Sequence, residues 1–195
     1  QEGSGLPQSL YMKARHPEQF YVFAGLNHVE VLSKGTVKTM DLATQVRAYV
    51  EMGCDGIKML ECKPTSRQQM NIPVTDPYYA EYWTQVEDMG IPIVWHVNDP
   101  EEFWDPATLP AWARKRKWGY GPDDVQKEQL YQEVDEVLTR HPKLRIVFAH
   151  FYFLSADLPR AQCFLDAHPT VKFDLTPGVE MLYNLSRHPD ESREF

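Results

Sequence analysis

Apolar residues along this chain gather in five short runs, and each run is followed by a loop and a stretch with helical periodicity. The runs are mostly apolar on both faces, which is typical of strands buried within a parallel sheet. Because strands and helices alternate, the pattern predicts successive βαβ units. The predicted strands span residues 20–26, 56–60, 91–97, 144–149 and 171–175.

Capping residues mark the ends of the predicted helices. Asp41 precedes the first helix and Gly53 follows it. Asp76 and Pro77 open the second helix, and Gly90 closes it. Aspartate accepts hydrogen bonds from the first free amides of a helix, and glycine tolerates the left-handed conformation that ends one. The four predicted helices span about residues 41–53, 76–90, 124–140 and 156–167.

These α/β units are compatible with a doubly wound sheet or with part of a (β/α) barrel. No GxGxxG sequence follows a predicted strand, so the dinucleotide-binding version of the doubly wound fold lacks its signature. No Walker-type GKS or GKT sequence occurs either. Periodicity alone leaves both arrangements open.

Composition and charge limit the classes of protein and partner. The 195 residues, 43% of them hydrophobic, are enough for one globular domain with a sizeable core. A formal net charge of −8 argues against nucleic acid and anionic membrane surfaces, and leaves self-association into a homo-oligomer undecided. No run of about 18 apolar residues predicts a membrane span. The three cysteines form no CxxC pair, which favours a reducing, cytoplasmic setting.

An unusually long connection, residues 99–122, lies between the third predicted strand and the third predicted helix. Loops of this length within a compact domain are often functional. One interpretation is a lid over a site at the carboxyl ends of the strands. The other is a surface excursion whose aromatic side chains pack on the wall of the domain. The aromatic residues of the connection are Phe103, Trp104, Trp112, Trp118 and Tyr120.

Three of the seven histidines end apolar runs, His28 in AGLNH, His96 in IVWH and His150 in IVFAH. In an α/β barrel the carboxyl ends of the strands converge on the active site. Neutral imidazole is a common ligand for zinc-like metals, so these histidines are candidate ligands. The other four precede proline and are typical of helix ends. They are His16, His141, His168 and His188.

Charged and amide side chains also lie in or shortly after the predicted strands, as the three strand-end histidines do. Lys58 lies inside the apolar strand GIKML, where a lysine is costly unless it is functional or forms a structural ion pair. Asp174 lies in VKFDL and Glu180 follows TPG. Carboxylates there suit general bases or groups that orient a ligand. Asn98 and Asp99 follow the second strand-end histidine, and Asp99 equally suits a helix cap.

Five stretches of the chain carry a family resemblance. Taken in order, HPEQFYVFAGLN, MGCDGIKML, GIPIVWHVNDPEEFWD, HPKLRIVFAHF and HPTVKFDLTPG resemble the amidohydrolase-related (family 2) branch of the amidohydrolase superfamily. The resemblance covers about residues 16–184 and implies a (β/α)₈ barrel of the TIM type, of which this chain supplies strands three to seven. The HxH pair of the first strand and the aspartate of the eighth are not seen in residues 1–195. We therefore expect a single domain that is truncated at both ends.

The resemblance also implies the chemistry. His96 and His150 correspond to the ligands of the fifth and sixth strands, which hold one divalent ion, zinc first and manganese or iron otherwise. The implied reaction is hydrolysis of a C–O or C–N bond in a small carboxylic-acid-like substrate by a metal-activated water, with non-oxidative decarboxylation as the alternative. Lys58 and Asp174 are the predicted catalytic groups. The predicted substrate contacts are His28, Trp95, Asn98, Trp104, Phe151 and Glu180.

Two other hypotheses remain from the sequence. The chain is a non-catalytic barrel remnant that only binds a ligand or partner, or it is a metal-free enzyme that uses Lys58 as a Schiff-base nucleophile.

One departure from the family pattern affects the expected width of the pocket. Phe151, Tyr152 and Phe153 stand where many members of the family have glycines, which predicts a narrower pocket.

Overall fold

The computed structural model describes residues 5–176 and 179–193. Within them, five parallel strands form one sheet whose spatial order matches the chain order. A doubly wound sheet reverses direction at a switch point, whereas a barrel adds each strand beside the last. The sheet therefore follows the barrel arrangement. The strands are β1 (Phe23–Gly25), β2 (Gly56–Cys62), β3 (Pro92–Val97), β4 (Arg145–Phe148) and β5 (Val171–Phe173).

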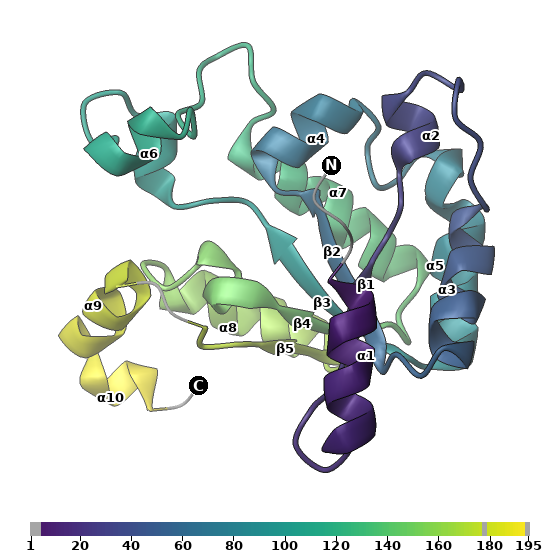
Figure 1. Cartoon of the computed structure of the whole chain (residues 1–195). Coiled ribbons are helices and arrows are strands. Elements are labelled where there is room, and N and C mark those ends of the chain that lie inside the picture. The colour runs from purple at the N-terminus through teal and green to yellow at the C-terminus, as the bar shows by residue number, and fades with distance from the viewer. Residues whose placement is uncertain (1–4, 177–178, 194–195) are drawn as a thin grey trace.

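Four helices cover one face of the sheet (Figure 1) and form a single core with it. Val46, Val86 and Leu130 come from three of these helices and are fully buried with Ile57 and Ile93 of the strands. Burying each such side chain contributes about 1.5–3 kcal/mol. The helices are α3 (Leu42–Glu51), α5 (Ala80–Met89), α7 (Lys127–Arg140) and α8 (Leu158–Ala167).

The opposite face of the sheet carries polar and exposed side chains. Along β2, Ile57 and Met59 are fully buried on the helical side, whereas Lys58 is only partly buried and Leu60 is 46% exposed. Successive side chains of a strand alternate between faces. By the strand register, Lys58 and Leu60 share the face that carries His96 on β3. In a closed barrel this face lines the interior.

The predicted helix caps are confirmed. The Asp41 carboxylate accepts a hydrogen bond of 2.8 Å from the Thr44 amide at the start of α3. Gly90 ends α5 in the left-handed conformation with a φ of 63°. The helix predicted over residues 76–90 begins as the 3₁₀ turn η1 (Pro77–Tyr79), which precedes α5.

Several elements differ from the prediction. The helix predicted from Asp124 begins at Lys127, because the Asp124 carboxylate accepts from the Gly121 amide and holds a turn. In residues 5–176 and 179–193, six further helices were not predicted, and most are too short or too polar to show apolar periodicity. None of the helices in the described ranges is long and apolar enough to cross a membrane. The six are α1 (Leu6–Arg15), α2 (Val29–Leu32), α4 (Pro64–Met70), α6 (Ala111–Lys115), α9 (Val179–Arg187) and α10 (Pro189–Ser192).

Gly56 opens β2 at a point where the chains pass very close together. A Cβ at this position would lie 2.3 Å from the Pro92 carbonyl oxygen and 2.4 Å from the Phe23 ring. We expect Gly56→Ala to lower the free energy of unfolding by about 1–3 kcal/mol, because backbone must move to admit the methyl group. Urea denaturation measures the change. Gly5→Ala is the control, since nothing lies within 4 Å of its Cβ, and an equal loss there would contradict the explanation.

Candidate metal and substrate site

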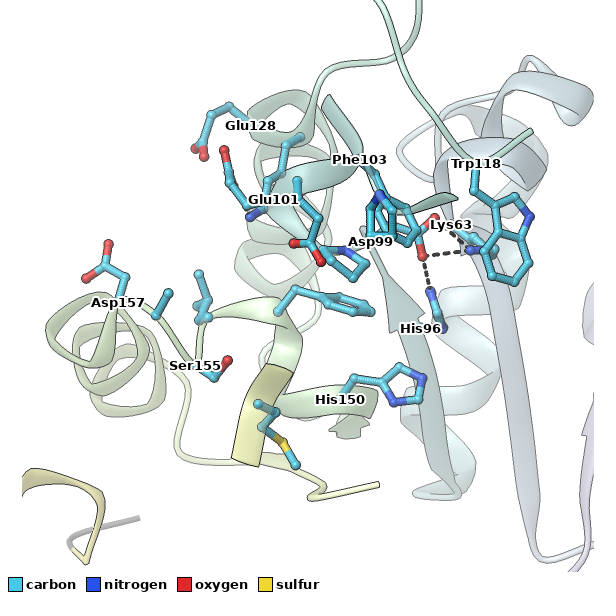
Figure 2. A pocket seen from close by; sticks show the side chains of 18 of the residues that line it. Lys63, His96, Asp99, Glu101, Phe103, Trp118, Glu128, His150, Ser155 and Asp157 are labelled. Atoms are coloured by element: carbon cyan, nitrogen blue, oxygen red, sulfur yellow. Dashed lines mark hydrogen bonds and ion pairs between the residues drawn. The ribbon is translucent and has the colours of Figure 1, made fainter. Parts of the chain in front are cut away.

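His96 and His150 lie next to each other at the carboxyl ends of neighbouring strands (Figure 2). His96 belongs to β3, and His150 lies in the turn that follows β4. Their ring centroids are 5.0 Å apart and their planes meet at 77°. The parallel pairing of β3 with β4 places these two strand ends side by side. The structure thus brings together the two residues predicted as metal ligands.

The separation of the two rings suits a shared metal ion. For two imidazoles bound to one tetrahedral zinc through nitrogens about 2.1 Å from the metal, the ring centroids lie about 5 Å apart. The observed 5.0 Å matches this value. Within residues 5–176 and 179–193, no group of three histidine, cysteine or carboxylate side chains is placed to hold a metal. The described residues therefore fit a divalent ion as a pair of ligands.

The Asp99 carboxylate contacts the His96 ring and helps to hold it in place. Asp99 Oδ1 lies 3.3 Å from His96 Nε2, and the same carboxylate accepts from Lys63 Nζ at 2.7 and 2.6 Å and from the Tyr120 hydroxyl at 2.5 Å. Burial acts to raise the pKa of Asp99, but the hydrogen bonds from His96, Lys63 and Tyr120 outweigh it and hold the pKa below its ordinary value. Burial also lowers the pKa of His96 despite the neighbouring carboxylate, which favours the neutral imidazole that a metal requires.

Asp174 supports His150 in a different way. Its Oδ1 accepts from the backbone amide of His150 at 2.8 Å and from the Thr176 hydroxyl at 2.5 Å, and that hydroxyl lies 3.2 Å from His150 Nδ1. Burial acts to raise the pKa of Asp174, but these hydrogen bonds outweigh it and lower the pKa. Asp174 is therefore an ionised group that anchors the backbone and ring of His150.

The turn after β4 has an uncommon conformation. Residues 150–153, within the turn η3 (Ala149–Phe153), have φ values of 60°, 55°, 56° and 53°. Left-handed residues other than glycine usually occur singly. The turn directs the Phe153 ring towards both histidines, with its centroid 5.4 Å from each of theirs. Phe153 therefore forms part of the wall beside the histidine pair.

A cavity of about 990 Å³ opens over the two histidines. One side comes from the long connection, through Phe103, Trp112 and Trp118, and Phe153 forms part of the wall as well. The cations that line the cavity all form ion pairs with carboxylates. These pairs are Lys63 with Asp99, Lys127 with Glu101, and Arg160 with Glu128.

The long connection, residues 99–122, has a small core of its own. It contains the 3₁₀ turn η2 (Glu101–Trp104) and α6, which stands away from the sheet in Figure 1. The Tyr120 amide donates to the Phe103 carbonyl at 2.8 Å and closes the segment on itself. Its aromatic side chains pack chiefly on one another, and Phe103, Trp112 and Trp118 also line the cavity. The core residues are Phe103, Trp104, Leu109, Ala113, Trp118 and Tyr120.

Four predicted substrate contacts lie outside the cavity lining. Trp95 is fully buried on the helical side of β3, between the rings of Trp83 and Phe148. Asn98 is also fully buried and donates to the Lys127 carbonyl. Phe151 is 1% exposed, and Trp104 belongs to the core of the long connection. The structure places these side chains in packing positions.

The remaining predicted residues lie elsewhere. Lys58 lies on the open face of the sheet, where burial lowers its pKa and the charges of Asp174 and Glu61 act against that shift. His28 contacts Glu61 at 2.7 Å and Tyr78 at 3.1 Å, and does not join the other two histidines. Glu180 is in α9, but its side chain lies outside the part of the chain that the structure describes.

Two residues of the site were missed from the sequence. Lys63 follows β2 directly, because the strand continues to Cys62, beyond its predicted end. A lysine in the position after a strand carries the same signal as the strand-end histidines and could have been found from it. Tyr120 carries no such signal, because its contact with Asp99 depends on how the long connection folds.

Comparisons with known proteins identify the fold. No family model matches the chain, and no curated protein matches it. Among the solved structures that match are 4-oxalomesaconate hydratase from Rhodopseudomonas palustris (14% identity, TM-score 0.55), 5-carboxyvanillate decarboxylase from Sphingomonas paucimobilis (15%, 0.53) and a TIM-barrel protein from Bordetella bronchiseptica (15%, 0.52). The matches cover 93%, 96% and 87% of this chain, but only 52%, 56% and 48% of the matched chains, in the same order.

The chain therefore spans about half the length of the structures it matches. At these identities the likeness shows the fold. The chain has the fold of part of a TIM barrel, which confirms the predicted fold class.

Proposed function

We propose that this chain belongs to a metal-dependent enzyme of the amidohydrolase type, which hydrolyses a C–O or C–N bond in a small carboxylic-acid-like substrate. The observation that carries the proposal is the pair His96 and His150. Their ring centroids lie 5.0 Å apart at the carboxyl ends of two parallel strands, beneath a large cavity. Strand ends of this kind are where TIM barrels place their active sites.

Each side chain of the site has a task in this proposal. His96 and His150 would hold one divalent ion, with zinc first by the donor set and manganese or iron as alternatives. Such an ion supplies a Lewis acid for a carbonyl or carboxylate oxygen and makes a water molecule more acidic. Asp99 and Asp174 keep the two rings in place. Phe103, a residue of the long connection, forms part of the apolar lining of the cavity.

The lysines and arginine that line the cavity are already paired with carboxylates, which supports the metal ion as the group that would bind an anionic substrate. Each lysine or arginine that lines the cavity already contacts a carboxylate. A substrate carboxylate would have to break one of these ion pairs or bind elsewhere. Lys58 does not line the cavity in the described part of the chain, so the Schiff-base alternative gains no support.

Non-oxidative decarboxylation is the second candidate reaction. The rings of Phe103, Trp112, Trp118 and Phe153 line the cavity and suit a flat aromatic acid. One protein with this fold, the 5-carboxyvanillate decarboxylase, carries out this class of reaction by its name. Release of carbon dioxide from an aromatic acid would favour decarboxylation, and incorporation of ¹⁸O from labelled water into the product would favour hydrolysis.

Metal content tests the proposal. We expect the purified chain to retain near-stoichiometric zinc after equilibration, because the two imidazoles are already placed for it. His96→Ala and His150→Ala should each weaken zinc binding by at least about 100-fold, since loss of a ligand exceeds the effect of losing a supporting group. Elemental mass spectrometry measures the zinc content, and chelator competition measures the affinity for zinc.

The control is His16→Ala, which removes an exposed imidazole far in sequence from His96 and His150 and should leave zinc binding unchanged. A parent chain without metal, or equal binding in all variants, would contradict the assignment of the ligands.

A further inference from the structure

The hydrogen bonds around Asp99 determine which nitrogen of His96 is free. An ionised carboxylate only accepts hydrogen bonds. Asp99 already accepts from Lys63 and Tyr120, and its Oδ1 lies 3.3 Å from His96 Nε2. The proton of the neutral imidazole therefore belongs on Nε2, and the lone pair belongs on Nδ1.

His150 has the opposite arrangement, and its protonation is set independently. The Thr176 hydroxyl has one proton and donates it to Asp174 at 2.5 Å. The hydroxyl oxygen can then only accept from His150 Nδ1, which lies 3.2 Å away. The lone pair of His150 therefore belongs on Nε2. None of these contacts involves Asp99, so His150 is an internal reference for any change at His96.

The long connection supplies part of the support for Asp99. Tyr120 donates to Asp99 Oδ2 at 2.5 Å and is 4% exposed within the small core of residues 99–122. Lys63 Nζ, which bonds both carboxylate oxygens, also lies 4.5 Å from the centroid of the Trp118 ring. The position of the connection is therefore linked to the orientation of the carboxylate behind His96.

We propose that Asp99 is a positioning residue that fixes the tautomer of His96, and that residues 99–122 act on the metal site through Tyr120. This inference rests on the proposed function in treating His96 as a ligand. It adds that the packing of the connection and the availability of His96 Nδ1 for a metal are linked. Asp99 itself is not the ligand, because its oxygens are occupied by Lys63, Tyr120 and His96.

Nitrogen-15 NMR of the histidine rings in the metal-free chain tests the proposal. The spectra are recorded at about pH 8, and in a neutral imidazole the two nitrogens have distinct shifts because only one of them carries a proton. We expect His96 to show a pyridine-type Nδ1 and His150 a pyridine-type Nε2. The His96→Ala and His150→Ala variants assign the two signals.

Asp99→Asn should redistribute the proton of His96. An amide both donates and accepts, so it supports either tautomer, and the population ratio should fall from more than about 10 to near 1. Tyr120→Phe keeps Asp99 and Lys63 but removes the contact from the connection, and should produce a smaller fall. Tyr183→Phe, at a tyrosine that is 59% exposed, should leave both rings unchanged.

Three results would overturn the inference. They are a pyridine-type Nε2 on His96 in the parent chain, an unchanged His96 tautomer in Asp99→Asn, or a Tyr120→Phe spectrum identical to that of Tyr183→Phe. The parent spectrum is informative even if a variant does not fold, which circular dichroism would show. Because no metal is present, a failure here is distinct from a failure to retain zinc.

Discussion

Replacing Arg67 with methionine is expected to lower the free energy of unfolding by about 3–5 kcal/mol, because it leaves a buried carboxylate without its partner. Arg67 of α4 is 6% exposed and Glu133 of α7 is 7% exposed. The guanidinium donates to the two carboxylate oxygens at 3.2 and 3.1 Å, and Glu133 also accepts from the Val74 amide at 3.3 Å. One ion pair thus joins α4, α7 and the segment between α4 and η1.

Chemical denaturation followed by tryptophan fluorescence measures this effect. The double variant Arg67→Met with Glu133→Leu is the informative control. Removing both charges leaves no uncompensated group, so the double variant should be more stable than the single one. Arg140→Met removes an exposed ion pair on the same helix and should cost about 0.5 kcal/mol. A single variant as stable as the parent would show that Glu133 finds another partner.

Trp95→Ala is expected to destabilise the chain by about 3–5 kcal/mol, through a cavity in the core rather than through loss of a substrate contact. The Trp95 ring centroid lies 5.2 Å from that of Trp83 and 5.7 Å from that of Phe148, and the side chain is fully buried. Its Nε1 has no hydrogen-bond partner in the described structure, so the ring is held by packing alone.

Trp95→Phe separates packing from the indole nitrogen. Phenylalanine keeps an aromatic ring between Trp83 and Phe148 and removes the unpaired donor, so the loss should be about 1–2 kcal/mol. Thermal unfolding of both variants, with zinc retention measured alongside, gives the comparison. Normal stability of Trp95→Ala with loss of ligand binding would contradict the core position.

The fold was predictable because it depends on local pattern. All five observed strands overlap the apolar runs, and Asp41 and Gly90 cap their helices as expected. The polar helix α4 lacks such a pattern, since its position depends on the ion pair of Arg67 with a glutamate far along the chain. Periodicity carries no information about a contact of that kind.

The site was only partly predictable. Strand-end position selected His28, His96 and His150, and the family resemblance singled out His96 and His150 as metal ligands. The structure places these two residues together. The alternation of strand side chains could have excluded Trp95, because a residue next to an inward-facing His96 must face the helices. The contacts of Asp99 with Lys63 and Tyr120 depend on the path of residues 99–122, which no local signal defines.

The left-handed turn after β4 determines which substitutions residues 150–153 should tolerate during evolution. Left-handed backbone costs about 1–2 kcal/mol for each residue with a Cβ, so glycine would relax positions 150–153. Phe151 and Tyr152 are each 1% exposed, and burial of their rings offsets that cost. Phe153 is less buried and lies against the two histidines. Position 153 is therefore where glycine should be accepted first among natural variants, and that exchange would widen the cavity over the two histidines while positions 151 and 152 remain aromatic.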